Sequence, residues 1–143
     1  MKLGFTGHRI IVNYDKLYLS IVEKLKELNP ECTISGMAIG ADQLFSVICI
    51  RLSIPFIAAV PFEGQECKWP THIQKQYNKI LSKAKEIVIV SEAGYDKDKF
   101  QLRNEWIVDN SDEMLAYWNG KGSGTGNCVK YANNLYKKIT NIY

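Results

Sequence analysis

Several short segments rich in glycine and polar side chains follow apolar runs of this sequence, and their residue types suit the binding of an anion. In the first segment, Thr6-Gly7-His8-Arg9, the hydroxyl and imidazole groups offer hydrogen bonds. The glycine lets a ligand approach the backbone, and the Arg9 guanidinium matches the geometry of a phosphate. The alternative for this segment is a plain turn with an exposed arginine and a packed histidine.

A second segment places Gly36 and Gly40 between a predicted strand and the start of a predicted helix. The backbone N–H groups of such a turn, together with the positive end of the helix dipole, favour an anion. Asp42, in the first helical turn, either caps the helix or binds a ribose hydroxyl. We expect a phosphate or ribose to contact this segment through Ser35, Gly36, Met37, Gly40 and Asp42.

Two later segments supply aromatic, amide and guanidinium groups. Phe62 or Trp69 is a candidate to stack on a base, with Gln65 at a polar edge of that base. The alternative for Trp69 is that it anchors its loop on the core. Arg103, beside Asn104 in a predicted helix, is placed to reach a phosphate, and an exposed surface arginine is the alternative.

A four-glycine loop, Asn119 to Asn127, opens the last predicted helix and is a second candidate for anion binding, through Gly124, Thr125 and Asn127. It differs from the dinucleotide-binding G-x-G-x-x-G fingerprint, which follows a first strand and precedes an acidic residue about twenty positions on. No G-x-x-x-x-G-K-[ST] motif occurs, which excludes a P-loop NTPase. A flexible turn is the alternative for this loop.

The elements that must position these segments are short apolar runs alternating with helical patterns. Strands are predicted at residues 2–6, 32–34, 55–60, 86–90 and 114–118, and helices at about 17–28, 44–52, 72–84, 99–110 and 125–139. This alternation predicts an α/β fold, a Rossmann-like three-layer sandwich with a mostly parallel sheet of five or more strands and helices on both faces. Such a sheet binds its ligand at the carboxyl ends of the strands, where the segments above fall. We therefore infer a cleft for a nucleotide-like ligand.

Length and composition narrow the class of protein. The 143 residues predict one domain, 1–143, and the 46% hydrophobic and 23% charged residues are typical of a soluble chain. No segment is long and apolar enough to span a bilayer and no signal peptide is visible, so we expect a cytoplasmic protein without a membrane partner. The net charge of +3 is scattered, which makes a nucleic-acid partner unexpected. Four cysteines without a CxxC pair predict neither a metal site nor disulfides, and no cofactor is required.

Five blocks, in order along almost the whole chain, resemble the YpsA-like branch of the SLOG superfamily. They are Gly4–Arg9, Ser35–Gln43, Pro61–Gln65 with Trp69, Arg103–Asp109, and Gly124–Asn127 with Tyr131-Ala132. The Ser-Gly-Met-Ala block is also similar to the DNA-processing protein A family, and LOG-type domains are more distant relatives. The resemblance implies a Rossmann-like fold that binds nucleotides or nucleotide-derived, ADP-ribose-like ligands, often in signalling or conflict systems. The pocket residues that it implies are Thr6, Gly7, Arg9, Ser35, Gly36, Asp42, Arg103, Asn104, Gly124 and Thr125.

One departure from the LOG-type pattern bears on catalysis. Those phosphoribohydrolases pair a Gly-Thr turn with a downstream catalytic glutamate, whereas Thr125 is followed here by Gly-Asn-Cys-Val. Asp42, Glu63 and Asp109 are candidate substitutes, and the spacing singles out none of them.

We therefore expect a non-catalytic binder that acts as a sensor, carrier or sequestering protein. The alternative is a hydrolase acting on a nucleotide N-glycosidic bond, and a third function is single-stranded nucleic-acid binding. A homo-oligomer is also expected, because Tyr131, Tyr136 and Tyr143 form a candidate aromatic surface near the end of the chain.

Overall fold

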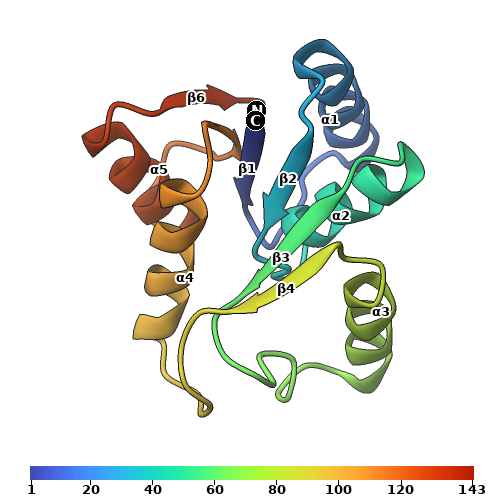
Figure 1. Cartoon of the computed structure of the whole chain (residues 1–143), viewed down its shortest axis with the longest axis vertical. Coiled ribbons are helices and arrows are strands. Elements are labelled where there is room, and N and C mark those ends of the chain that lie inside the picture. Colours follow the sequence, from blue (N-terminus) through green and yellow to red (C-terminus); the bar gives the residue numbers. More distant parts are fainter.

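The computed structural model describes residues 1–143, in which strands and helices alternate along the chain (Figure 1). The strands are β1 (Lys2–Gly7), β2 (Cys32–Ser35), β3 (Phe56–Val60), β4 (Glu86–Ile89), β5 (Glu113–Tyr117) and β6 (Lys138–Asn141). The helices are α1 (Tyr14–Leu28), α2 (Ala41–Arg51), α3 (Thr71–Leu81), α4 (Asp98–Asp109) and α5 (Gly124–Asn134). Each of the predicted strands and helices has its counterpart, and β6 is an additional strand.

The six strands form one sheet in the order β4-β3-β2-β1-β5-β6, and every neighbouring pair is parallel. This arrangement confirms the predicted Rossmann-like α/β fold. The chain builds the sheet outward from β1 to β4, then returns to the other side of β1 to add β5 and β6. The strand order therefore reverses between β1 and β5, and a parallel sheet opens a crevice at the carboxyl ends of its strands at such a point.

Helices cover both faces of the sheet. In a right-handed crossover, the face on which the helix lies depends on the direction in which the chain moves across the sheet to its next strand. Figure 1 shows α1, α2 and α3 on one side of the sheet and α4 and α5 on the other. Phe5, Phe45 and Tyr77 belong to the core on the first side, and Ile34 and Ile107 belong to the core on the second. Alternate residues of the central strand β3 thus enter opposite cores, as the side-chain period of two requires: Phe56, Ala58 and Val60 in the first, Ile57 and Ala59 in the second.

The last predicted helix, 125–139, is wrong at its carboxyl end. α5 ends at Asn134, and Tyr136 has a positive φ of 57° that an α-helix does not accommodate. Residues 138–141 then pair with β5 as the edge strand β6. Because this strand contains only one aliphatic residue, Ile139, its sequence shows no strand period.

The predicted aromatic surface of three tyrosines is also wrong. Tyr136 precedes β6 and Tyr143 follows it, so the two side chains lie at opposite ends of that strand. Tyr131 donates its hydroxyl hydrogen to Asp109 of α4. Self-association therefore stays a prediction, and the three tyrosines no longer support it. No helix of the structure combines the length and the apolar character needed to cross a membrane.

Candidate functional site

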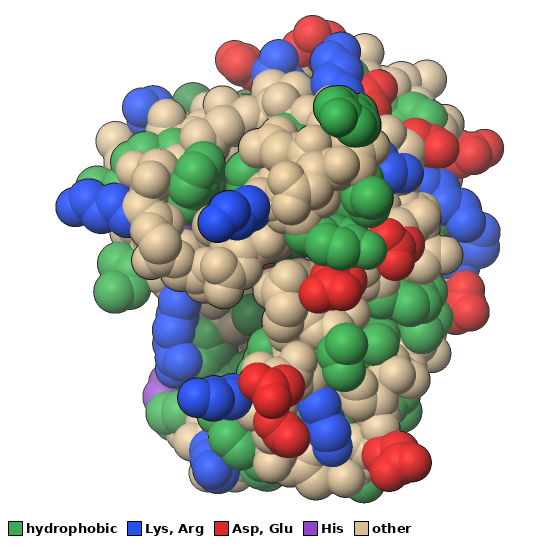
Figure 2. All heavy atoms as spheres, turned by 90° about the vertical axis from the view of Figure 1, so that its left-hand side faces the viewer, with side chains coloured by type: hydrophobic (Ala, Val, Ile, Leu, Met, Phe, Trp, Pro, Cys, Tyr) green, Lys and Arg blue, Asp and Glu red, His purple; other side chains and the backbone are tan.

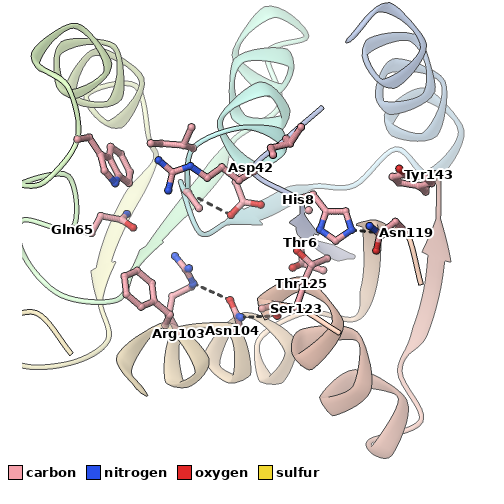
Figure 3. Close-up of a pocket in the computed structure, with 18 of the residues that line it drawn as sticks. Thr6, His8, Asp42, Gln65, Arg103, Asn104, Asn119, Ser123, Thr125 and Tyr143 are labelled. Carbon is pink, nitrogen blue, oxygen red and sulfur yellow. Dashed lines mark hydrogen bonds between the residues drawn. The ribbon is translucent and has the colours of Figure 1, made fainter. Parts of the chain in front are cut away.

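A cleft of about 820 Å³ lies at the carboxyl ends of the strands, over the point where the strand order reverses (Figure 3). Ligand-binding clefts commonly have volumes of about 300–1,000 Å³. The sequence-predicted residues that line the cleft are Thr6, Gly7, His8, Arg9, Asp42, Gln65, Trp69, Arg103, Asn104, Gly124 and Thr125. The loops after β1, β3, β4 and β5, the start of α2 and one side of α4 thus converge on one space.

The segment after β1 is held between β5 and α2 by its backbone. The His8 N–H donates to the Tyr117 carbonyl over 3.2 Å, and the Ala41 N–H donates to the His8 carbonyl over 3.1 Å. Arg9 follows this anchored point, is exposed, and makes neither a hydrogen bond nor an ion pair within the chain. Its guanidinium is therefore free to bind a ligand anion.

The His8 imidazole is fixed in a neutral form. Desolvation by burial lowers the pKa of His8 below its ordinary value of 6.5. The backbone N–H of Asn119 donates to His8 Nε2 over 2.8 Å, so this nitrogen carries no proton. His8 thereby joins the loop after β1 to the loop after β5 on one side of the cleft.

The turn between β2 and α2 is shaped by residues that lie behind the cleft wall. Met37 is fully buried with a φ of 60°, and its N–H donates to the Ser35 hydroxyl. Gly40 has a φ of 95°, and a Cβ there would collide with the Arg9 carbonyl. Ser35, Gly36, Met37 and Gly40 therefore do not line the cleft, contrary to the predicted contact with the ligand, and position Asp42 instead.

Asp42 lies on the cleft wall in the first turn of α2, almost fully buried. It does not cap the helix, because Gly40 is the N-cap and makes no side-chain hydrogen bond. Its Oδ2 accepts from the Ala38 N–H over 3.4 Å. Burial raises the pKa of Asp42 from 3.8 to about 6, and the positive charge of Arg103 offsets only part of this effect.

Arg103 extends from α4 into the cleft and faces it from the side opposite Asp42 (Figure 3). Its side chain is 4% exposed, so burial lowers its pKa while the charge of Asp42 raises it. Nη1 donates to the Gly36 carbonyl over 2.6 Å, and Nε donates to Asn104 Oδ1 over 3.0 Å. The interpretation of Arg103 as a plain surface arginine is thus wrong.

The start of α5 presents unpaired donors to the cleft. The Ser123 hydroxyl caps the helix by accepting from the Gly126 N–H over 3.0 Å. The N–H groups of Gly124 and Thr125, in the first turn, have no partner in the chain. With the helix dipole behind them, these groups can hold a phosphate.

The other end of the cleft, beside β3 and β4, is aromatic. Trp69, Tyr95 and Phe100 line it, and Lys68 Nζ lies 3.8 Å from the centre of the Tyr95 ring. Phe62 is 1% exposed and packs edge-on beneath Tyr95 and Phe100, so the prediction that Phe62 stacks on a base is wrong.

Trp69 and Gln65 both fix the loop after β3. Trp69 packs perpendicular to Tyr77, with ring centres 5.3 Å apart, and so anchors this loop while it lines the cleft. Gln65 Nε2 donates to the Gly36 carbonyl and to the Tyr77 hydroxyl. The alternative that Trp69 anchors its loop is therefore confirmed, and its stacking on a base stays a prediction for a residue that lines the cleft.

Three further candidate residues also lie away from the cleft lining: Glu63 and Asn127, both exposed, and Asp109, bound to Tyr131. Sequence reasoning missed ten lining residues, which are Ile10, Val12, Ala38, Ile39, Lys68, Tyr95, Phe100, Asn119, Ser123 and Tyr143. Most of them belong to the loops already singled out, so taking each whole loop as a candidate would have found them. Tyr143, which follows the unpredicted β6, left no such signal.

The charge of the cleft favours an anionic ligand. Its lining contains Arg9, Lys68 and Arg103 but a single carboxylate, Asp42. Elsewhere the charges are mixed, and Figure 2 shows acidic and basic side chains interspersed over the α4 and α5 side of the molecule. The structure contains no cluster of three or more metal-ligating side chains.

Comparison with known sequences identifies the family. The model of the YspA SLOG family matches residues 15–142, which leaves the Thr6–Arg9 segment outside the match. The SPbeta prophage-derived protein YoqJ of Bacillus subtilis is 32% identical over 139 residues, a match that takes in 85% of this chain and 81% of YoqJ. A UPF0398 protein of Bacillus thuringiensis is 23% identical over 105 residues, or 73% of this chain and 57% of that protein.

Solved structures support the same fold. DNA processing protein A from Helicobacter pylori, described with a single-stranded DNA binding mode, superposes with a TM-score of 0.73 at 20% identity. That superposition covers 97% of this chain and 63% of the other. DNA processing protein A from Streptococcus pneumoniae gives a TM-score of 0.74 at 17% identity, covering 96% and 48%. These structures show the fold, whereas the family model and the similarity to YoqJ confirm the resemblance to the SLOG superfamily.

Proposed function

The chain belongs to the YspA SLOG family, and we propose that it binds a nucleotide or a nucleotide-derived, ADP-ribose-like ligand in the cleft, as a sensor, carrier or sequestering protein. One observation carries the proposal. A single cleft combines unpaired helix N–H groups and arginines, which suit phosphate, with aromatic rings in its lining, which suit a base.

The order of the strands supports one orientation of the proposed ligand. β5 lies on one side of β1, and β3 and β4 lie on the other, so the α5 donors and the aromatic residues occupy opposite ends of the cleft. A phosphate bound by Gly124 and Thr125 would leave the base near Trp69 or Tyr95. The sugar between them would lie beside Asp42 and Arg103, which Figure 3 shows in the middle of the cleft.

Calorimetry against AMP, NAD, ADP-ribose and cyclic ADP-ribose tests this function, with each mixture then separated by HPLC. Binding with the ligand recovered intact supports a sensor or sequestering protein. A released base or sugar phosphate would instead support the N-glycosidase alternative, with Asp42 as the one carboxylate on the cleft wall. If none of the four compounds binds at millimolar concentration, the proposed function is wrong for this ligand class.

A second candidate is single-stranded DNA binding, favoured by the structural similarity to DNA processing protein A and by the Arg9, Lys68 and Tyr95 side chains at the open cleft. Cations paired with aromatic rings suit a flexible strand. The test is fluorescence anisotropy with a labelled oligo-dT strand at rising salt. DNA binding predicts an affinity that falls steeply with salt concentration, whereas no binding at low salt would exclude it.

A further inference from the structure

Two buried side-chain atoms in the structure lack a hydrogen-bond partner, and both belong to residues that line the cleft. They are Asp42 Oδ1 and Gln65 Oε1. Buried polar atoms in proteins are nearly always paired, so an unpaired one at a binding cleft indicates a group that the ligand supplies. Both atoms are acceptors, so a hydrogen-bond donor on a ligand could pair with either of them.

The Asp42 carboxylate is held so that one oxygen stays available. Oδ2 accepts from the Ala38 N–H, which fixes the plane of the group. The Gly7 N–H faces the carboxylate from β1 without reaching hydrogen-bond geometry. The Ser35 and Ser46 hydroxyls both donate to the Asp42 carbonyl, which anchors the residue itself. The Asp42 side chain is thus positioned by the fold and is not needed as a helix cap.

Arg103 provides an unpaired hydrogen-bond donor near the Asp42 carboxylate. Nη1 and Nε are committed to Gly36 and Asn104, whereas Nη2 makes no hydrogen bond. No nitrogen of Arg103 comes within 4.0 Å of an Asp42 oxygen, so the two charges do not form a direct ion pair. A hydroxyl group is both donor and acceptor, so one hydroxyl can donate to Asp42 Oδ1 and accept from Arg103 Nη2.

We propose that Asp42 and Arg103 bind a ribose hydroxyl; if this is the 2′-hydroxyl, the cleft also selects ribonucleotides over deoxyribonucleotides. The inference rests on the proposed function, because it needs a phosphate at α5 and a base at the aromatic end. With both in place, the sugar is the part of the ligand that lies beside Asp42. The 2′-hydroxyl is the group by which proteins distinguish ribonucleotides from deoxyribonucleotides.

The experiment compares AMP or ADP-ribose, whichever binds, with its 2′-deoxy and 3′-deoxy counterparts by calorimetry. The wild-type chain should bind one deoxy analogue about 10- to 100-fold more weakly, the factor expected for a hydrogen bond to a charged group. In Asp42→Asn, the amide oxygen keeps the hydrogen bond from the Ala38 N–H, so the NH₂ group replaces Oδ1 and cannot accept a hydrogen bond. The variant should therefore lose most of this preference, and Asp15→Asn, which makes the same charge change on α1, should keep it.

Separate outcomes overturn the two proposals. Equal affinity of the wild-type chain for the ribose and both deoxy forms overturns the hydroxyl contact and leaves nucleotide binding intact. A full ribose preference in Asp42→Asn overturns the assignment to Asp42. If none of AMP, NAD, ADP-ribose and cyclic ADP-ribose binds, the proposed function and the inference that rests on it both fail.

Discussion

Arg103 of α4 donates through Nη1 to the carbonyl oxygen of Gly36 over 2.6 Å, across 67 residues of sequence. The contact joins the turn after β2 to the helix on the other face of the sheet. It exists because residue 36 has no side chain, since a Cβ there would lie 2.6 Å from Nη1. The glycine of the Ser-Gly-Met-Ala block therefore makes room for a cleft cation, and its contribution to binding is indirect.

Gly36→Ala should displace the Arg103 guanidinium and weaken the binding of AMP or ADP-ribose by about tenfold or more. It should also destabilise the fold by about 1–3 kcal/mol, because a buried charged group loses its partner. Calorimetry measures the first effect and urea unfolding the second. Gly122→Ala is the matched control, since a Cβ at residue 122 meets no atom within 4 Å. Unchanged affinity in Gly36→Ala would show that the position of Arg103 does not matter to the ligand.

Arg9→Ala should separate binding from stability. The Arg9 side chain is exposed and makes no contact that folding requires, so the free energy of unfolding should change by less than about 0.5 kcal/mol. The loss of one charge-assisted contact to phosphate should weaken AMP binding by about tenfold or more. Lys26→Ala removes the same charge from the exposed surface of α1 and should leave affinity unchanged. An equal loss of AMP affinity in both variants would mean that the net charge of the protein, and not a contact of Arg9, determines binding.

The fold could be predicted from the sequence because its strands and helices carry strong periods and alternate throughout. Eleven of the residues predicted in this way line the cleft, because the loops that follow parallel strands lie at one edge of the sheet. It failed for β6, whose pairing with β5 depends on a tertiary position that Lys138–Asn141 do not encode locally. It also failed to separate lining residues from supporting ones, because Gly36 and Met37 look like ligand contacts until the packing behind them is seen.

The tautomer of His8 should make the loop after β5 sensitive to acid. The folded pKa of His8 lies below its ordinary value of 6.5, so its contribution to stability is present above pH 6.5 and is lost as the pH falls from there through the folded pKa. Protonation of Nε2 also removes the acceptor for the Asn119 N–H. His8→Gln keeps an acceptor and has no charge to gain, so its stability relative to wild type should rise as the pH falls below 6.5.

Histidine ring resonances in NMR follow the titration directly, and His8→Gln assigns them by the signal that disappears. The Asn119 amide should shift together with the His8 ring in the wild-type chain. A titration of His8 at or above pH 6.5 would contradict the lowered pKa that partial burial of the imidazole predicts.

Asp42→Asn should lose the preference for a ribose ligand and raise the free energy of unfolding. The folded pKa of Asp42, about 6, lies above the ordinary value of 3.8, so the folded state holds this proton more tightly than the unfolded state. Stability therefore falls as the pH rises from about 4 to 6, and stays lower above that range. The difference corresponds to about 3 kcal/mol at most at neutral pH. Asparagine carries no charge to bury, so the variant should unfold at higher urea concentration than wild type at pH 7.5.

Urea unfolding of both chains at pH 7.5 and pH 4 measures this effect, because the advantage of the variant should shrink toward zero at the lower pH. Comparing each chain with the other at one pH cancels His8, whose contribution changes in the opposite direction. A residue that lowers the free energy of unfolding is expected at a position where it binds a ligand. If Asp42→Asn were less stable than wild type at pH 7.5, the carboxylate would be a structural group, and its unpaired oxygen would no longer indicate a ligand.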